Sequence, residues 1–129
     1  MKFNEILPAD KVRNMNPVVL AFVGDAVYTL YVREKVVSSG DYKTGALNKM
    51  AAQTVCASAQ ARLAEQISTY FTEAENDVFR RARNAKKTSR ARNASVADYN
   101  ASTGFEAVIG YLYLTGNYAR LNELLALKD

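Results

Sequence analysis

Beyond Pro17 the chain contains no proline, and this absence does most to narrow the folds it can adopt. Proline inside a helix removes a backbone hydrogen bond and clashes with the preceding turn, so its absence leaves long helices possible. Apolar residues then recur every three or four positions, as in Leu20, Val23 and Val27, whereas strand-like alternation is scarce. The pattern predicts an all-α fold, and the length fits one domain over residues 1–129.

Capping residues divide the sequence into helices. Asn16 before Pro17 is a typical helix start, Thr72 and Glu75 form a capping box, and Ser95 or Asp98 begins a later helix. We expect helices over residues 17–37, from 41 or 44 to 66, 73–84, from 95 or 98 to 115, and 121–127, most of them antiparallel to their neighbours. Residues 85–94 are expected to form an exposed loop. In the second helix the core candidates are Leu47, Met50, Val55 and Leu63.

The residue types that are missing exclude several kinds of chemistry. The chain has no histidine and one cysteine, Cys56, which removes Ser-His and Cys-His nucleophiles, disulfides and cysteine-based zinc sites. Hydrolysis would therefore depend on carboxylates and a hard cation such as Mg²⁺ or Mn²⁺. The N-terminus does not read as a secretory signal and no segment reads as a membrane span, so we expect a cytoplasmic protein without a membrane partner.

Positive charge is concentrated in residues 80–92, RRARNAKKTSRAR, which contain no acidic residue although the chain carries a net charge of only +4. Such a concentration indicates a surface that binds a polyanion. The alternative is a solvated charged face without a partner. The residues expected to make the contact are Arg80, Arg81, Arg83, Asn84, Lys86, Lys87, Arg90 and Arg92.

Two carboxylates lie in segments that otherwise read as apolar helix. Asp25 follows Gly24 within AFVGDAVY, and Glu106 stands between Gly104 and Gly110 within STGFEAVIGYLYL. Aspartate and glycine are both unfavourable inside helices, so their presence together suggests a functional reason. Glycine allows another backbone or a ligand to approach closely. The alternative is that each carboxylate is an ordinary exposed helix residue or pairs with an arginine.

The segment LAFVGDAVY, followed by STGFEAVIGYLYL, resembles the two central motifs of the ribonuclease III catalytic domain. The resemblance is closer to the short bacterial branch of that family, Mini-ribonuclease III. This branch also carries an RxRNAK element like residues 81–86 and a segment like SAQA at residues 58–61. The ordered set of motifs extends from about Leu20 to Leu125.

The resemblance implies a ribonuclease III-like helical bundle that forms a homodimer, uses Mg²⁺ with Mn²⁺ as a substitute, and hydrolyses both strands of duplex RNA. The expected products carry 5′-phosphate and 3′-hydroxyl ends. By motif position, Asp25 and Glu106 are the expected metal ligands and catalytic residues. We expect no separate RNA-binding domain after residue 129, so residues 80–92 and a second surface over residues 43–60, including Lys49, would grip the duplex. By kinship, the expected substrate is precursor ribosomal RNA of the large subunit (23S).

The chain departs from the pattern of the full-length enzymes at two positions. They carry a glutamate four residues before the aspartate, where this chain has Ala21, and an aspartate three residues before the glutamate, where it has Thr103. Helical spacing puts both replacements on the faces of Asp25 and Glu106. We expect Thr103 to orient a water molecule through its hydroxyl, without binding the metal directly.

Two other functions are compatible with parts of the sequence. The missing carboxylates would suit a noncatalytic protein of the same fold that binds double-stranded RNA. The basic helical composition would suit a helix-turn-helix DNA-binding protein, but that reading leaves Asp25 and Glu106 without a role.

Overall fold

The computed structural model describes residues 1–87 and 93–127 of the chain. These residues contain no strand, which confirms the predicted all-α class, and none of their helices is long and apolar enough to cross a bilayer. The elements are α1 (Ala9–Arg13), α2 (Pro17–Ser39), α3 (Thr44–Val55), α4 (Ala57–Ile67), the 3-10 turn η1 (Ser68–Tyr70), α5 (Glu73–Asn84), α6 (Val96–Leu114) and α7 (Tyr118–Ala126).

The predicted capping residues begin three of these helices. The Asn16 side chain accepts a hydrogen bond from the backbone of α2, and Ser95 accepts one from the backbone of α6. At the start of α5, the Glu75 N–H donates to the Thr72 hydroxyl at 3.1 Å, and the Thr72 N–H donates to the Glu75 carboxylate at 2.9 Å. These reciprocal bonds confirm the capping box.

The prediction of a single helix that ends near residue 66 is wrong in one respect. The chain forms two helices there, α3 and α4, with a break at Cys56. The Cys56 backbone is extended, with φ −65° and ψ 156°. The carbonyl of Val55, the last residue of α3, accepts a hydrogen bond of 2.9 Å from the Gln60 side chain. A side chain from the next helix thus satisfies a carbonyl that the break leaves without a helical partner.

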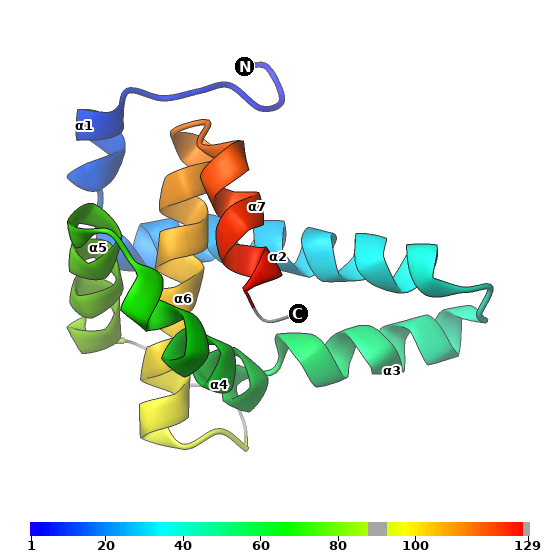
Figure 1. Cartoon of the computed structure of the whole chain (residues 1–129). Helices are drawn as coiled ribbons and strands as arrows, with labels where there is room; N and C mark the ends of the chain where they lie inside the picture. Colours follow the sequence, from blue (N-terminus) through cyan, green and yellow to red (C-terminus); the bar gives the residue numbers. More distant parts are fainter. Residues whose placement is uncertain (88–92, 128–129) are drawn as a thin grey trace.

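The second half of α2 and the whole of α3 form an antiparallel arm that extends away from the other helices (Figure 1). Of the three predicted core residues on α3, Val55 is half-buried against the core, whereas Leu47 and Met50 are half-buried outside it. Helical periodicity identified their shared apolar face, but not that the face would meet one helix instead of the central core. Leu63 on α4, in contrast, is buried as predicted.

Helix α6 lies at the centre of the molecule, with α2, α4, α5 and α7 packed around it (Figure 1). Helices α2 and α3, which a short loop joins, run antiparallel as predicted, whereas α2 crosses α6 instead of running alongside it. At the crossing the two backbones touch. A Cβ atom added to Gly24 would lie 1.7 Å from the Glu106 carbonyl oxygen, and one added to Gly110 would lie 2.0 Å from the Leu20 carbonyl oxygen. Only glycine fits at either position.

An ion pair between half-buried Arg120 and buried Glu75 joins α7 to the start of α5. The Arg120 guanidinium donates two hydrogen bonds of 2.9 Å to the Glu75 carboxylate and one to the Tyr70 carbonyl. Burial alone would raise the pKa of Glu75. Hydrogen bonds from Arg120 and from the Thr72 backbone, together with the charge of Arg120, nevertheless hold this pKa below its usual value. Glu75 therefore stays ionised while it serves both the capping box and the ion pair.

We expect Gly24→Ala and Gly110→Ala each to lower the free energy of unfolding by about 3 kcal/mol, because each methyl group overlaps backbone that cannot rotate away. Urea unfolding followed by circular dichroism measures the change. Gly45→Ala is the matched control, since its Cβ would meet no atom within 4 Å. In a helix it should stabilise by up to about 1 kcal/mol. Equal stability of all three variants would contradict the close crossing.

Candidate active site

The crossing of α2 and α6 brings Asp25 and Glu106 side by side. Asp25 follows Gly24, whose backbone packs directly on the Glu106 carbonyl. The Asp25 carboxylate lies near enough to that of Glu106 to share a hydrogen bond with it and to influence its ionisation. Two acidic side chains from distant parts of the sequence therefore form one carboxylate pair.

The two members of the pair have different surroundings. Asp25 is exposed to solvent, whereas Glu106 is half-buried. Burial first, and then the hydrogen bond and negative charge of Asp25, raise the pKa of Glu106 to about 8. A hydrogen bond donated by Gln60 acts in the opposite direction. In the absence of a cation, Glu106 therefore keeps a proton at neutral pH.

Gln60 is a site residue that the sequence did not single out. Its side chain is 2% exposed and donates from Nε2 to the Glu106 carboxylate at 3.3 Å. The signal that was available is the SAQA segment, in which a glutamine stands within the first turns of a helix whose inner face is otherwise apolar. Nothing in that segment indicates that α6 would lie against it.

Ala21 and Thr103, which replace acidic residues of the full-length enzymes, are each 5% exposed. The Thr103 hydroxyl donates to the Tyr99 carbonyl at 3.0 Å, one turn earlier in α6. Its hydrogen is therefore engaged, and only its lone pairs remain to receive a hydrogen bond from water. The role of Thr103 in orienting a water molecule stays a prediction.

The donor set suits a hard divalent cation that keeps much of its water. Within the described part of the chain, no group of three or more His, Cys, Asp or Glu side chains is placed to hold a metal ion. The Asp25–Glu106 pair thus offers two carboxylates. Mg²⁺ commonly binds through one or two carboxylates, water molecules and substrate phosphate, so the residues present fit this ion.

The residues expected to bind RNA divide into two groups. Arg81 donates to Asp77 and to the Arg13 carbonyl, and Lys87 donates to the Ala82 and Arg83 carbonyls at the end of α5. These two side chains support the local structure. The members exposed to solvent are Arg80, which pairs with Asp77, and Arg83, Asn84 and Lys86.

One other predicted contact lies on a different helix. Lys49 is exposed on the arm, away from α5 (Figure 1). Arg90 and Arg92 lie outside the described residues. Among the described residues, Lys49 is therefore separate from the basic side chains at the end of α5.

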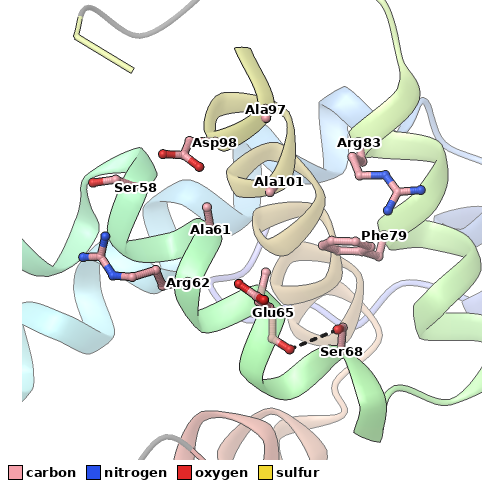
Figure 2. A pocket seen from close by; sticks show the side chains of 11 residues that line it. Ser58, Ala61, Arg62, Glu65, Ser68, Phe79, Arg83, Ala97, Asp98 and Ala101 are labelled. Atoms are coloured by element: carbon pink, nitrogen blue, oxygen red, sulfur yellow. Dashed lines mark hydrogen bonds between the residues drawn. The ribbon is translucent and has the colours of Figure 1, made fainter. Parts of the chain in front are cut away.

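A hollow of about 360 Å³ lies between α4, α5 and the first turns of α6 (Figure 2). Neither Asp25 nor Glu106 lines it. Its charged lining side chains are two guanidinium groups and two carboxylates, those of Arg62, Arg83, Glu65 and Asp98. The hollow therefore lacks the net positive charge of a phosphate site. We therefore treat it as separate from the carboxylate pair.

Comparisons with known proteins show the family to which the chain belongs. The family model described as Ribonuclease III domain matches residues 18–117, which include the helix crossing and both carboxylates. A crystal structure of protein FN1578 from Fusobacterium nucleatum is 29% identical, with a TM-score of 0.82 over 89% of this chain and 93% of that one. The chain therefore belongs to the ribonuclease III domain family, a class of endoribonucleases.

Curated relatives narrow the assignment within this class. The Mini-ribonuclease 3 of a Thermoanaerobacter strain is 42% identical over 96% of this chain and 87% of its own length. That of Clostridium tetani is 45% identical over 89% of this chain and 77% of its own length. That of Symbiobacterium thermophilum is also 45% identical, over 84% of this chain and 84% of its own length. This likeness groups the chain with the Mini-ribonuclease 3 proteins.

We expect the metal-free protein to lose stability as the pH rises from about 5 to about 8. Over this range folded Glu106, with a pKa of about 8, holds a proton that the unfolded chain has released. Mg²⁺ or Mn²⁺ needs ionised carboxylates, so the stabilisation from added metal should grow with pH. Thermal unfolding from pH 5 to 9, with EDTA or with metal, measures both effects.

Glu106→Gln should flatten this pH dependence and reduce the stabilisation by metal. Glu34→Gln is the matched control, because Glu34 is an exposed acidic residue of α2. If Glu106→Gln behaved like Glu34→Gln, the carboxylate pair would not be the source of the pH dependence.

Proposed function

We propose that this chain hydrolyses double-stranded RNA as a divalent-metal-dependent endonuclease, with Asp25 and Glu106 as its metal-binding and catalytic carboxylates. The observation that carries the proposal is the meeting of these two side chains at the crossing of α2 and α6. The exposure of Asp25 supports it further, since a polymeric substrate needs an accessible site.

The two carboxylates would share the binding of Mg²⁺, or of Mn²⁺ in its place. When bound, the ion supplies a Lewis acid that activates water and stabilises the charge developing at the scissile phosphate. Asp25 would hold the ion from the solvent side, and Glu106 from the protein side, where Gln60 donates to its carboxylate. With no histidine in the chain, a histidine general base is excluded.

The basic residues of α5 and the segment after it would hold the duplex. Arg83, Asn84 and Lys86 are exposed and can reach phosphates or sugar hydroxyls, and Arg80 can do so if its pair with Asp77 opens. Arg90 and Arg92 join this group on sequence alone. Lys49 on the arm would contact a more distant part of the duplex.

We propose that the protein acts as a homodimer that uses the outer face of α2. Val19, Phe22 and Leu30 recur on that face at helical spacing and are 49%, 79% and 51% exposed. A second copy would bury these side chains, which are too large and apolar to be favoured in water. Asp25 lies on the same helix, three residues after Phe22. Two carboxylate pairs would thus be available, one for each strand.

The natural substrate that we propose is precursor ribosomal RNA of the large subunit, processed in the cytoplasm to 5′-phosphate and 3′-hydroxyl ends. The resemblance to Mini-ribonuclease III supports this choice. A noncatalytic role in binding double-stranded RNA is the second candidate, because the described residues provide a pair of carboxylates without a third. Cleavage of duplex RNA separates the two.

We expect purified protein to cut long duplex RNA with Mg²⁺, and Asp25→Asn or Glu106→Gln to slow cleavage by about 100-fold or more. Each variant should still bind the duplex, because the phosphate contacts lie elsewhere. Gel assays of cleavage and binding, with the ribosomal precursor and an unrelated duplex as substrates, measure both properties.

Glu34→Gln serves as the matched control and should cut like the parent protein. Changing Arg83 and Lys86 together to glutamine should weaken binding and flatten its dependence on salt. A parent protein that binds duplex RNA without cutting it, in either Mg²⁺ or Mn²⁺, would establish the noncatalytic role instead.

We expect Phe22→Glu to convert a dimer into monomers in analytical ultracentrifugation, because the new charge would be buried at the interface without a partner. Tyr70→Glu is the control, since Tyr70 is 59% exposed on η1 and away from α2. The variant should retain its helical circular dichroism. A monomeric parent protein, or a Phe22→Glu variant that remains dimeric, would rule out this interface.

A further inference from the structure

Gln60 makes two hydrogen bonds that point in different directions from one buried amide. Its Nε2 atom donates to the Val55 carbonyl at 2.9 Å and to Glu106 Oε2 at 3.3 Å. An amide nitrogen carries two hydrogens, so both bonds form at once. The side chain is 2% exposed, which excludes solvent as a competing partner.

These contacts fix the orientation of the amide. If it were reversed, the Gln60 carbonyl oxygen would face the Val55 carbonyl, which can only accept a hydrogen bond. In the observed orientation Oε1 is instead buried without a hydrogen-bond partner. A buried oxygen without a hydrogen-bond partner is unfavourable. The chain tolerates this cost where an apolar residue would avoid it, which indicates that the two donated bonds serve a purpose.

The first bond anchors Gln60 to the break between α3 and α4. Val55 ends α3, and the extended backbone of Cys56 turns the chain into α4. Since the Gln60 amide donates to the carbonyl at this break, the side chain is anchored to the backbone there. It therefore presents a fixed donor to α6.

The second bond acts on Glu106 from the side of α4, while Asp25 approaches it from α2. A free glutamate side chain has three rotatable bonds, and its carboxylate would sample many positions. Ligands of metal ions are commonly oriented by hydrogen bonds from residues that do not touch the metal. Gln60 is in the position to do this for Glu106.

We propose that Gln60 is a positioning residue for RNA hydrolysis, which holds the Glu106 carboxylate toward Asp25 by bridging it to the α3–α4 break. The inference rests on the proposed function of the carboxylate pair. Gln60 itself touches neither metal nor substrate. Its removal should therefore weaken cation binding and turnover without changing the affinity for RNA.

The test compares Gln60→Met, which keeps the length of the side chain but removes the donor, with Gln66→Met. Gln66 is exposed on the same helix and provides the matched control. For Gln60→Met we expect a 10- to 100-fold weaker affinity for Mn²⁺ and a similar fall in kcat, roughly the range for residues that orient metal ligands. The KM for duplex RNA should not change. Electron paramagnetic resonance of free Mn²⁺ measures affinity without RNA or turnover.

A second measurement does not need the variant to fold. In the parent protein labelled with ¹⁵N, the side-chain amide signals of Gln60 should shift when Mg²⁺ is added, and Asp25→Asn should abolish the shift. The Gln66 signals should not respond. If the protein binds Mg²⁺ but the Gln60 signals do not shift, the inference is overturned.

The outcomes separate this inference from the proposed function. If Gln60→Met binds Mn²⁺ and cuts RNA like Gln66→Met, while Glu106→Gln does neither, the positioning role is wrong and the carboxylate pair stands. If Glu106→Gln also behaves like the parent protein, the proposed function fails first. A Gln60→Met variant that loses only thermal stability would show a structural role and contradict positioning.

Discussion

The contact between the backbones of α2 and α6 at Gly24 and Gly110 is the constraint on which the rest of the structure depends. Side chains normally keep packed helices 8–10 Å apart, whereas two glycines allow the main chains themselves to meet. Asp25 is placed beside Glu106 only because its neighbour in the chain has no side chain. The same residue that weakens α2 as a helix therefore creates the carboxylate pair.

The carboxylate pair is unfavourable without a cation, and this property suits its proposed role. Burial disfavours the ionised form of Glu106, the hydrogen bond and charge of Asp25 add to this effect, and Glu106 therefore retains a proton. A divalent cation would replace that proton and relieve the repulsion. Because burial raises the pKa of Glu106, a cation bound by both carboxylates would have to compete with this proton.

Features that depend on neighbours along the chain could be predicted from the sequence. The helix starts at Asn16, Thr72 and Ser95 are local hydrogen-bond patterns. Asp25 and Glu106 stood out because each is a carboxylate in an otherwise apolar helical segment, within recognisable motifs. The break at Cys56 could not be predicted from the sequence. The Val55 carbonyl at the break accepts a hydrogen bond from Gln60, and Gln60 also donates to Glu106, which lies on a helix far along the sequence. The periodicity of apolar residues identifies the face of a helix that packs, but not the helix against which it packs.

The adjacency of Gly24 and Asp25 has a consequence for how α2 can change. Successive residues of a helix differ by about 100° in direction, so one faces the crossing while the next faces the solvent. Inserting or deleting a single residue before Gly24 would rotate both away from their places at once. The number of residues between the start of α2 and the crossing is therefore fixed by helical geometry.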